Sequence, residues 1–187
     1  IEKALKRLKC KSVKGIEFSD EAVKKARGKN LPVEKATLKE LIDKGETFDA
    51  VCSFQVLEHI SSPRPFLEEA LKVLRPGGAL ILCVPNKDSF LKYQYNLLDM
   101  PPHHMTRWCL DTFKYLEKIF PMKLVKSSFE PLAAYHINGY VNAYGRNICK
   151  RVPVPSVAFN SISSLLKITR LYRYCRGQSI YVRFEKL

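Results

Sequence analysis

The chain has 187 residues, 46% of them hydrophobic and 27% charged, which is typical of a globular protein and argues against a disordered or fibrous one. This length predicts one domain over 1–187, and no apolar run approaches the roughly 18 residues of a membrane span. The formal net charge of +14 favours an anionic partner such as nucleic acid, an acidic membrane surface or a phosphorylated substrate, with a merely solubilising surface as the alternative.

Strand-like and helix-like segments alternate along the chain. The run "SDEAVKKAR", 19–27, predicts a helix because Ser19 is a good N-cap, two acidic residues follow it and Gly28 comes after its end. The run "PFLEEALKVL", 65–74, repeats apolar residues at helical spacing, and "RPGG" then ends it. The remaining pattern predicts strands at 11–18, 33–36, 48–54, 79–84, 123–129 and 179–184, and a further helix at 110–120.

Alternating strands and helices predict βαβ units, and hence an α/β fold with a parallel sheet covered on both faces. Ligands of such sheets bind beyond the carboxyl ends of the strands. The most polar of these ends follows the strand "FDAVCSF", which we expect to be buried; there Gln55, Glu58 and His59 occur within five residues. Another end carries Glu17, whose carboxylate can bind the two hydroxyls of a ribose, although an exposed strand-end glutamate is an equal alternative.

The segment "PPHHMTRW", 101–108, places two histidines, an arginine and a tryptophan within six residues on an expected loop. Loops carry function disproportionately, and histidine serves as a base, a hydrogen-bond donor or a metal ligand near neutral pH. We therefore expect a functional role for His103 and His104. For Trp108 we expect packing. For Arg107 the alternative to a functional role is an ion pair with a carboxylate.

Three segments together resemble the class I S-adenosylmethionine-dependent methyltransferases: "VKGIEFSDEAVKKAR", "FDAVCSFQVLEHISSPRPFLEEALKVLRPGGALILCVPN" and "PPHHMTRW". The resemblance is closest to the group that includes quinone-biosynthesis O-methyltransferases and methyltransferases of glycan and metabolite pathways. It covers 11–129, and 179–184 fits the family's last strand. It implies a Rossmann-like doubly wound sheet of order 3-2-1-4-5-7-6, with strand 7 antiparallel, and S-adenosylmethionine as the cofactor.

The resemblance also implies a role for each site residue. The cofactor-binding residues would be Glu17 at the ribose, Phe18, Thr37 and Leu38 at the adenine, and Phe54 and Gln55 at the methionine end. Glu58, His103 and Arg107 would face the substrate. The candidate catalytic bases are His59 and His104, so the expected reaction is O-methylation of a small-molecule, glycan or lipid-linked acceptor, without a metal.

One family feature is missing from these 187 residues: the Gly-rich turn G-x-G-x-G that lets the backbone approach the cofactor. The run "IEKALKRLKC", 1–10, resembles the helix that follows this turn. We therefore expect strand 1 of the sheet to be absent from the chain, and the chain alone to bind the cofactor weakly.

Two alternatives stay open. The run "QVLEH" with a later histidine is similar to the metal-binding pattern of small-RNA 3′-terminal methyltransferases, and a basic chain would suit RNA. Gln55 replaces one expected carboxylate there, and an amide is a poorer ligand for a hard cation. The other alternative is a non-catalytic remnant of the fold that binds anions or membranes.

The last third of the chain is strongly basic, with nine Lys or Arg and one Glu between 131 and 187. The segment 131–177 separates the last two strands and is too long for a plain connection. We expect it to form a cap over the active site, with 146–176 in peripheral contact with an anionic membrane and nucleic acid as the less favoured partner. Because the six cysteines form no C-x-x-C pair, we expect reduced thiols and a cytoplasmic protein.

Overall fold

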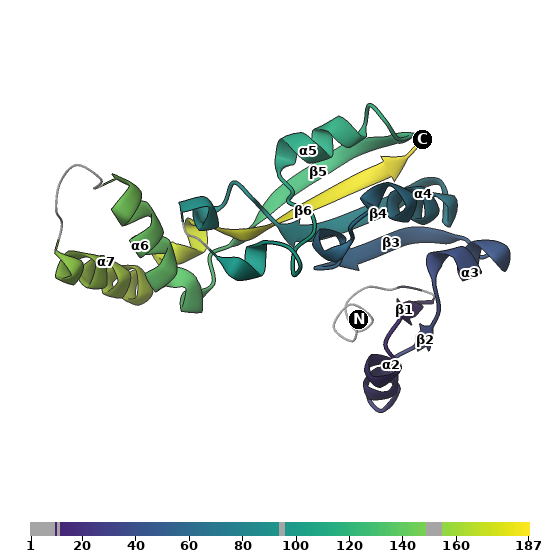
Figure 1. The fold of residues 1–187 in the computed structure, drawn as a ribbon, viewed down its shortest axis with the longest axis horizontal. Helices are drawn as coiled ribbons and strands as arrows, with labels where there is room; N and C mark the ends of the chain where they lie inside the picture. The colour runs from purple at the N-terminus through teal and green to yellow at the C-terminus, as the bar shows by residue number, and fades with distance from the viewer. Residues whose placement is uncertain (1–9, 11, 94–95, 149–154) are drawn as a thin grey trace.

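The computed structural model describes residues 10, 12–93, 96–148 and 155–187, in which two sheets and their helices form an α/β architecture (Figure 1). The larger sheet has the strand order β3-β4-β6-β5. Strands β3 and β4 run parallel, and β6 is antiparallel to both of its neighbours. This confirms a Rossmann-like sheet with an antiparallel last strand. The bounds are β3 (Phe48–Phe54), β4 (Leu74–Pro85), β5 (Met122–Pro131) and β6 (Arg176–Lys186).

A second, two-stranded sheet pairs β1 (Gly15–Glu17) in parallel with β2 (Val33–Lys35). Helix α2 (Asp20–Arg27) connects them and is capped as predicted, since the Ser19 hydroxyl accepts a hydrogen bond from the Ala22 amide. In the family's strand numbering, β1 and β2 are the predicted neighbours 2 and 3. The order β3-β4-β6-β5 of the larger sheet is the predicted order 4-5-7-6. Within the described residues no strand joins β1 to β3, so the complete order across strand 1 stays a prediction. The helix expected over 1–10 lies outside those residues except for Cys10, which is not helical.

The main core lies between the larger sheet and helices α3 (Leu38–Asp43), α4 (Pro63–Lys72) and α5 (Leu110–Leu116). Strand β4 contributes every second side chain to it, as the pleat of a strand requires. Both predicted helices in this region exist, with slightly different ends. Central members of the core are Leu67, Leu71, Leu80, Leu82, Phe113 and Phe184, each with at most 5% of its surface exposed.

The prediction of a buried strand at 48–54 is wrong in its burial. Ser53 is the buried residue of β3, whereas Cys52 and Phe54 are exposed. In the described part of the chain β3 pairs with β4 alone, so one side of this strand has no neighbouring strand to cover it. The apolar composition of β3 therefore exceeds what the described residues bury.

The segment between β5 and β6 forms a small helical unit with its own apolar cluster. It contains α6 (Ile137–Ile148), α7 (Ser156–Thr169) and the short helix η5 (Leu171–Tyr174). In Figure 1 these helices extend from one end of the larger sheet. Gly145 of α6 lies under the ring of Phe159 of α7, where a Cβ atom would collide with the ring. Among the helices described, none combines the length and the apolar character that crossing a bilayer takes.

Candidate active site

Strand β3 ends in a backbone bend at Gln55. This residue has a φ of 54°, in the left-handed region that non-glycine residues rarely adopt. Its backbone N–H donates to the carbonyl of Cys83, at 2.8 Å, and its side-chain Nε2 lies 3.5 Å from the Cys83 sulfur. Strained backbone of this kind clusters at functional sites. The bend directs the chain out of the sheet and into the short helix η1 (Leu57–His59).

The Cys83 thiol beside Gln55 and the neighbouring Tyr181 hydroxyl are uncharged near neutral pH. A hydrogen bond with Cys83 raises the pKa of Tyr181 to about 12, and burial raises the pKa of the Cys83 thiol. Both groups therefore keep their protons at pH 7. The sequence gives no signal for this pair, because Cys83 and Tyr181 become neighbours only through the antiparallel pairing of β4 with β6.

Helix η1 is tied to the second polar segment of the chain. The carbonyl of Glu58 accepts hydrogen bonds from the backbone amides of Met105, at 2.8 Å, and Thr106, at 3.0 Å. The Thr106 hydroxyl donates to the carbonyl of Leu57, and the indole N–H of Trp108 donates to that hydroxyl. Trp108 is 4% exposed, so its predicted packing role is confirmed. These bonds hold the residues after β3 against the loop that carries the two adjacent histidines.

Three histidines meet at this junction. His59, His103 and His104, called the histidine cluster below, have ring centroids 5.0 to 5.1 Å apart. Nδ1 of His59 lies 2.7 Å from the carbonyl oxygen of His103. Because a carbonyl only accepts, Nδ1 carries the proton, and the neutral ring of His59 has its lone pair on Nε2. The candidate bases of the sequence analysis are thus brought together.

The carboxylate of Asp99 orients the third imidazole. Its Oδ1 lies 3.0 Å from Nδ1 of His104, and its Oδ2 lies 3.0 Å from the guanidinium of Arg107. The same argument puts the proton of a neutral His104 on Nδ1 and leaves Nε2 as the acceptor. Asp99 is absent from the candidates of the sequence analysis. Its position five residues before His104, in "LLDMPPHH", is the signal that could have indicated it.

Glu58 is a buried carboxylate at the edge of the histidine cluster. It is 2% exposed, and within the described residues its Oε2 has no hydrogen-bond partner. Its Oε1 lies 3.9 Å from Nε2 of His59. One ring nitrogen from each of the three histidines lies within 4.8 Å of the others, so the cluster can hold a metal ion. A charge buried without a partner is costly, which suggests that this site binds a donor or a cation.

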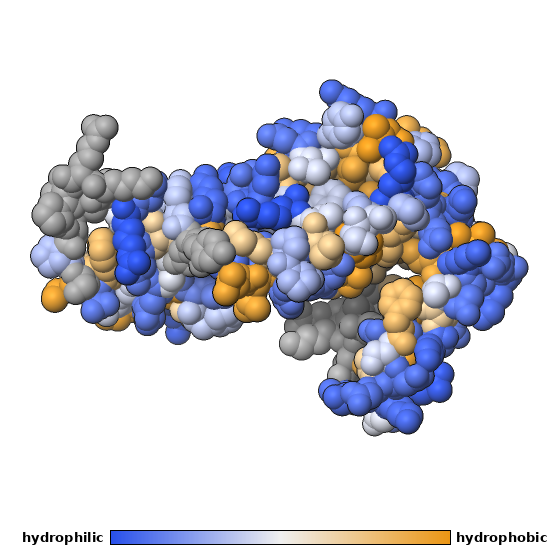
Figure 2. Space-filling view, in the orientation of Figure 1, coloured by the Kyte–Doolittle hydropathy of each residue, from blue (hydrophilic) through white to orange (hydrophobic). Residues whose placement is uncertain are grey.

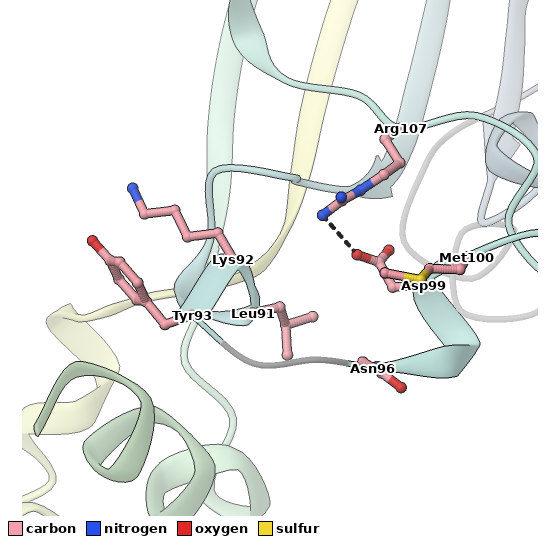
Figure 3. A pocket seen from close by; sticks show the side chains of 7 residues that line it. All are labelled: Leu91, Lys92, Tyr93, Asn96, Asp99, Met100 and Arg107. Carbon is pink, nitrogen blue, oxygen red and sulfur yellow. Dashed lines mark ion pairs between the residues drawn. The ribbon is translucent and has the colours of Figure 1, made fainter. Parts of the chain in front are cut away.

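A cavity of about 320 Å³ opens beside the ion pair of Asp99 and Arg107 (Figure 3). Its walls come from η2 (Phe90–Tyr93) and from the segment around η3 (Leu97–Asp99). Asp99 is shared between the cavity and His104, so a molecule bound there lies next to the histidine cluster. The lining residues are Leu91, Lys92, Tyr93, Asn96, Asp99, Met100 and Arg107.

The residues expected at the cofactor lie at two strand ends and at one helix start. Glu17 ends β1, and its Oε1 accepts from the amides of Phe18 and Ser19, at 2.7 and 3.1 Å. The ring of Phe18 is 70% exposed. Thr37 forms a capping box with Glu40, and Leu38 is buried in the core. Thr37 and Leu38 thus have structural roles, and their place at the adenine stays a prediction.

Residues 2–82 match a family model described as "Methyltransferase domain". The ubiquinone biosynthesis O-methyltransferase of Rhizobium etli is 29% identical over 147 residues, which are 78% of this chain and 52% of that protein. The mitochondrial ubiquinone biosynthesis O-methyltransferase of Dictyostelium discoideum is 40% identical over 52 residues, which are 28% of this chain and 16% of that protein. The chain spans about half the length of these curated relatives or less.

Solved structures share the fold at low sequence identity. A SAM dependent methyltransferase from Archaeoglobus fulgidus is 20% identical with a TM-score of 0.54, over 92% of this chain and 75% of that one. The cyclopropane synthase MmaA2 from Mycobacterium tuberculosis is 14% identical with a TM-score of 0.60, over 99% of this chain and 73% of that one. At these identities the likeness concerns the fold alone.

Proposed function

Since the chain belongs to the class I S-adenosylmethionine-dependent methyltransferases, we propose that it methylates the hydroxyl of a small-molecule acceptor beside the histidine cluster. The observation that carries this proposal is the meeting of His59, His103 and His104, which come from two loops more than forty residues apart. In the neutral rings of His59 and His104 the hydrogen bonds leave Nε2 free to accept a proton.

The described residues fit part of the cofactor site. S-adenosylmethionine, when bound, supplies an electrophilic methyl group. One carboxylate oxygen of Glu17 accepts from the backbone amides of Phe18 and Ser19, and the other oxygen is available to two ribose hydroxyls. Gln55 and Phe54 stand at the carboxyl end of β3, where an α/β sheet binds its ligands. These placements support the cofactor roles that the resemblance implies.

In the proposed reaction the bound cofactor would supply the methyl group to the acceptor oxygen, and the electron pair of the carbon–sulfur bond would stay on its sulfur. The hydroxyl proton passes to Nε2 of His104. Asp99 keeps the opposite nitrogen protonated and stabilises the positive charge that develops on the ring. A positioned base of this kind contributes about 10²- to 10⁴-fold. His59 stands next to it as the second candidate base.

We extend the proposal to the acceptor pocket and its cover. The cavity next to Asp99 combines apolar walls with Lys92 and with the ion pair of Arg107 and Asp99, which suits an apolar acceptor that carries a polar group. The expected cap over 131–177 is supported by contacts of α6 with the wall of that cavity. The ring of Tyr140 lies 5.5 Å from Phe90, and that of Tyr144 lies 5.2 Å from Tyr93.

A divalent cation at the histidine cluster is the second candidate, favoured by the unpartnered buried oxygen of Glu58. Three imidazoles are a donor set that suits zinc and related metals. Such an ion would bind the acceptor oxygen and lower its pKa. The RNA acceptor of the sequence analysis would use the same cluster, and both it and the cytoplasmic setting stay predictions.

The test is a comparison of His104→Gln with the unaltered full-length protein. Methyl transfer to a panel of phenolic and aliphatic alcohols should fall by about 100-fold or more, while calorimetric titration shows unchanged binding of S-adenosylmethionine. Unaltered turnover in the variant would remove His104 from the reaction. Equal loss of cofactor binding would mean that the substitution disturbs the fold instead.

A further inference from the structure

Helix α7 carries exposed aliphatic side chains in addition to those that it packs. Phe159 and Leu166 pack toward the apolar cluster shared with α6. On the opposite side, at a spacing of 100° per residue, two exposed serines lie among Val157, Leu165 and Ile168, which are 69%, 59% and 80% exposed. A surface helix normally turns charged residues outward, whereas the outward side of α7 carries only serines and exposed aliphatic side chains. The outward side of α7 therefore calls for a partner.

Cations gather at and beyond the carboxyl end of α7. Lys167, Arg170 and Arg173 are all exposed. Within the described ranges, none of the three is part of an ion pair. The sequence has no acidic residue between Glu130 and Glu185, so the whole segment carries positive charge without neutralisation. This charge selects an anionic partner.

An aromatic residue completes the pattern. Tyr174 of η5, which follows α7 directly, is 89% exposed, and Leu171 is 51% exposed. Figure 2 shows apolar side chains at the molecular surface in the part that α6 and α7 occupy. Exposed aliphatic side chains, a tyrosine and adjacent cations are what the boundary between lipid headgroups and acyl chains accommodates.

We propose that α7 and η5 form a surface that lies on an anionic lipid bilayer, with Leu165 and Ile168 inserted and Lys167 and Arg173 at the headgroups. The 14 residues of α7 extend about 21 Å, a length that suits a helix lying in the plane of the interface. A second copy of the chain would bring two like-charged surfaces together, and an acidic protein would leave the row of aliphatic side chains without a function. The proposal does not depend on the proposed methyl transfer.

The experiment is co-sedimentation of the full-length protein with vesicles, without cofactor or acceptor. One set of vesicles is pure phosphatidylcholine, and the other contains phosphatidylcholine and phosphatidylglycerol in equal parts. Binding should require the anionic lipid. The double variant Leu165→Ser and Ile168→Ser should lower the affinity for these vesicles by at least about tenfold. Lys167→Gln and Arg173→Gln should weaken binding by about fivefold for each cation removed.

The matched control removes two exposed cations elsewhere, with Lys25→Gln and Lys29→Gln at α2. It should retain binding, and circular dichroism should show all variants folded. Three outcomes overturn the proposal: equal binding to both vesicle types, equal binding by all the variants, or a dimer in light scattering that the serine variant alone abolishes.

Discussion

Asp99 and His104 form a carboxylate–imidazole pair, with 3.0 Å between Oδ1 and Nδ1. The side chains are 16% and 14% exposed, so water competes little for this contact. The other carboxylate oxygen accepts from Arg107, at 3.0 Å, which fixes the plane of the carboxylate. The orientation of His104 toward His59 thus depends on Asp99, which acts on the proposed base and is not the base itself.

Asp99→Asn should reduce turnover by at least about tenfold with little change in stability. Asparagine has one acceptor oxygen, and Arg107 takes it because a guanidinium only donates. The amide N–H₂ then faces Nδ1 of His104 and favours the wrong tautomer. Steady-state kinetics give the measurement, and Asp111→Asn, at an exposed position of α5, is the control. Turnover that matches this control would contradict the positioning role.

Glu58→Gln should separate stability from activity. The carboxylate is buried with an oxygen that lacks a partner among the described residues, so a neutral side chain of the same size should leave the free energy of unfolding within about 1 kcal/mol or raise it. Turnover should fall by about tenfold or more if the carboxylate faces the acceptor or a cation. Urea denaturation and kinetics on the same preparation test both parts. Strong destabilisation would show that Glu58 serves the fold.

Chelation should distinguish the two candidate ways of activating the acceptor. For a direct histidine base, turnover should survive dialysis against EDTA largely unchanged. For a bound cation, turnover should be lost with EDTA and restored by added zinc, cobalt or magnesium. Cobalt binding can be followed by its visible absorption, and His103→Asn should weaken it.

Gly145→Ala should destabilise the helical unit by about 1–3 kcal/mol, because the new methyl group meets the ring of Phe159. Phe159→Ala should make the glycine substitution much less costly, since the ring is then gone. A double-mutant cycle by thermal unfolding measures this coupling. Additive effects of the two substitutions would mean that α6 and α7 do not pack as described.

The sequence by itself determined the elements and the class of fold. Capping at Ser19, helical spacing in 65–74 and the alternation of strands and helices are local signals, and each matches an observed element. The residues after β3 and the histidine loop were also visible as candidates, because polar residues at strand ends and in loops contrast with their neighbours.

Only the tertiary structure decided which of these residues act together. Asp99 was missed because its position five residues before His104 does not by itself show that the two side chains meet. The burial of Glu58 and the exposure of Phe54 were likewise invisible, since both depend on which elements cover the strand end. Segment 131–177 was recognised as basic, but its outward apolar side followed from the packing of α7 on α6. Burial and the hydrogen bonds between distant segments depend on the whole fold. They decide which polar residues lie together in one site.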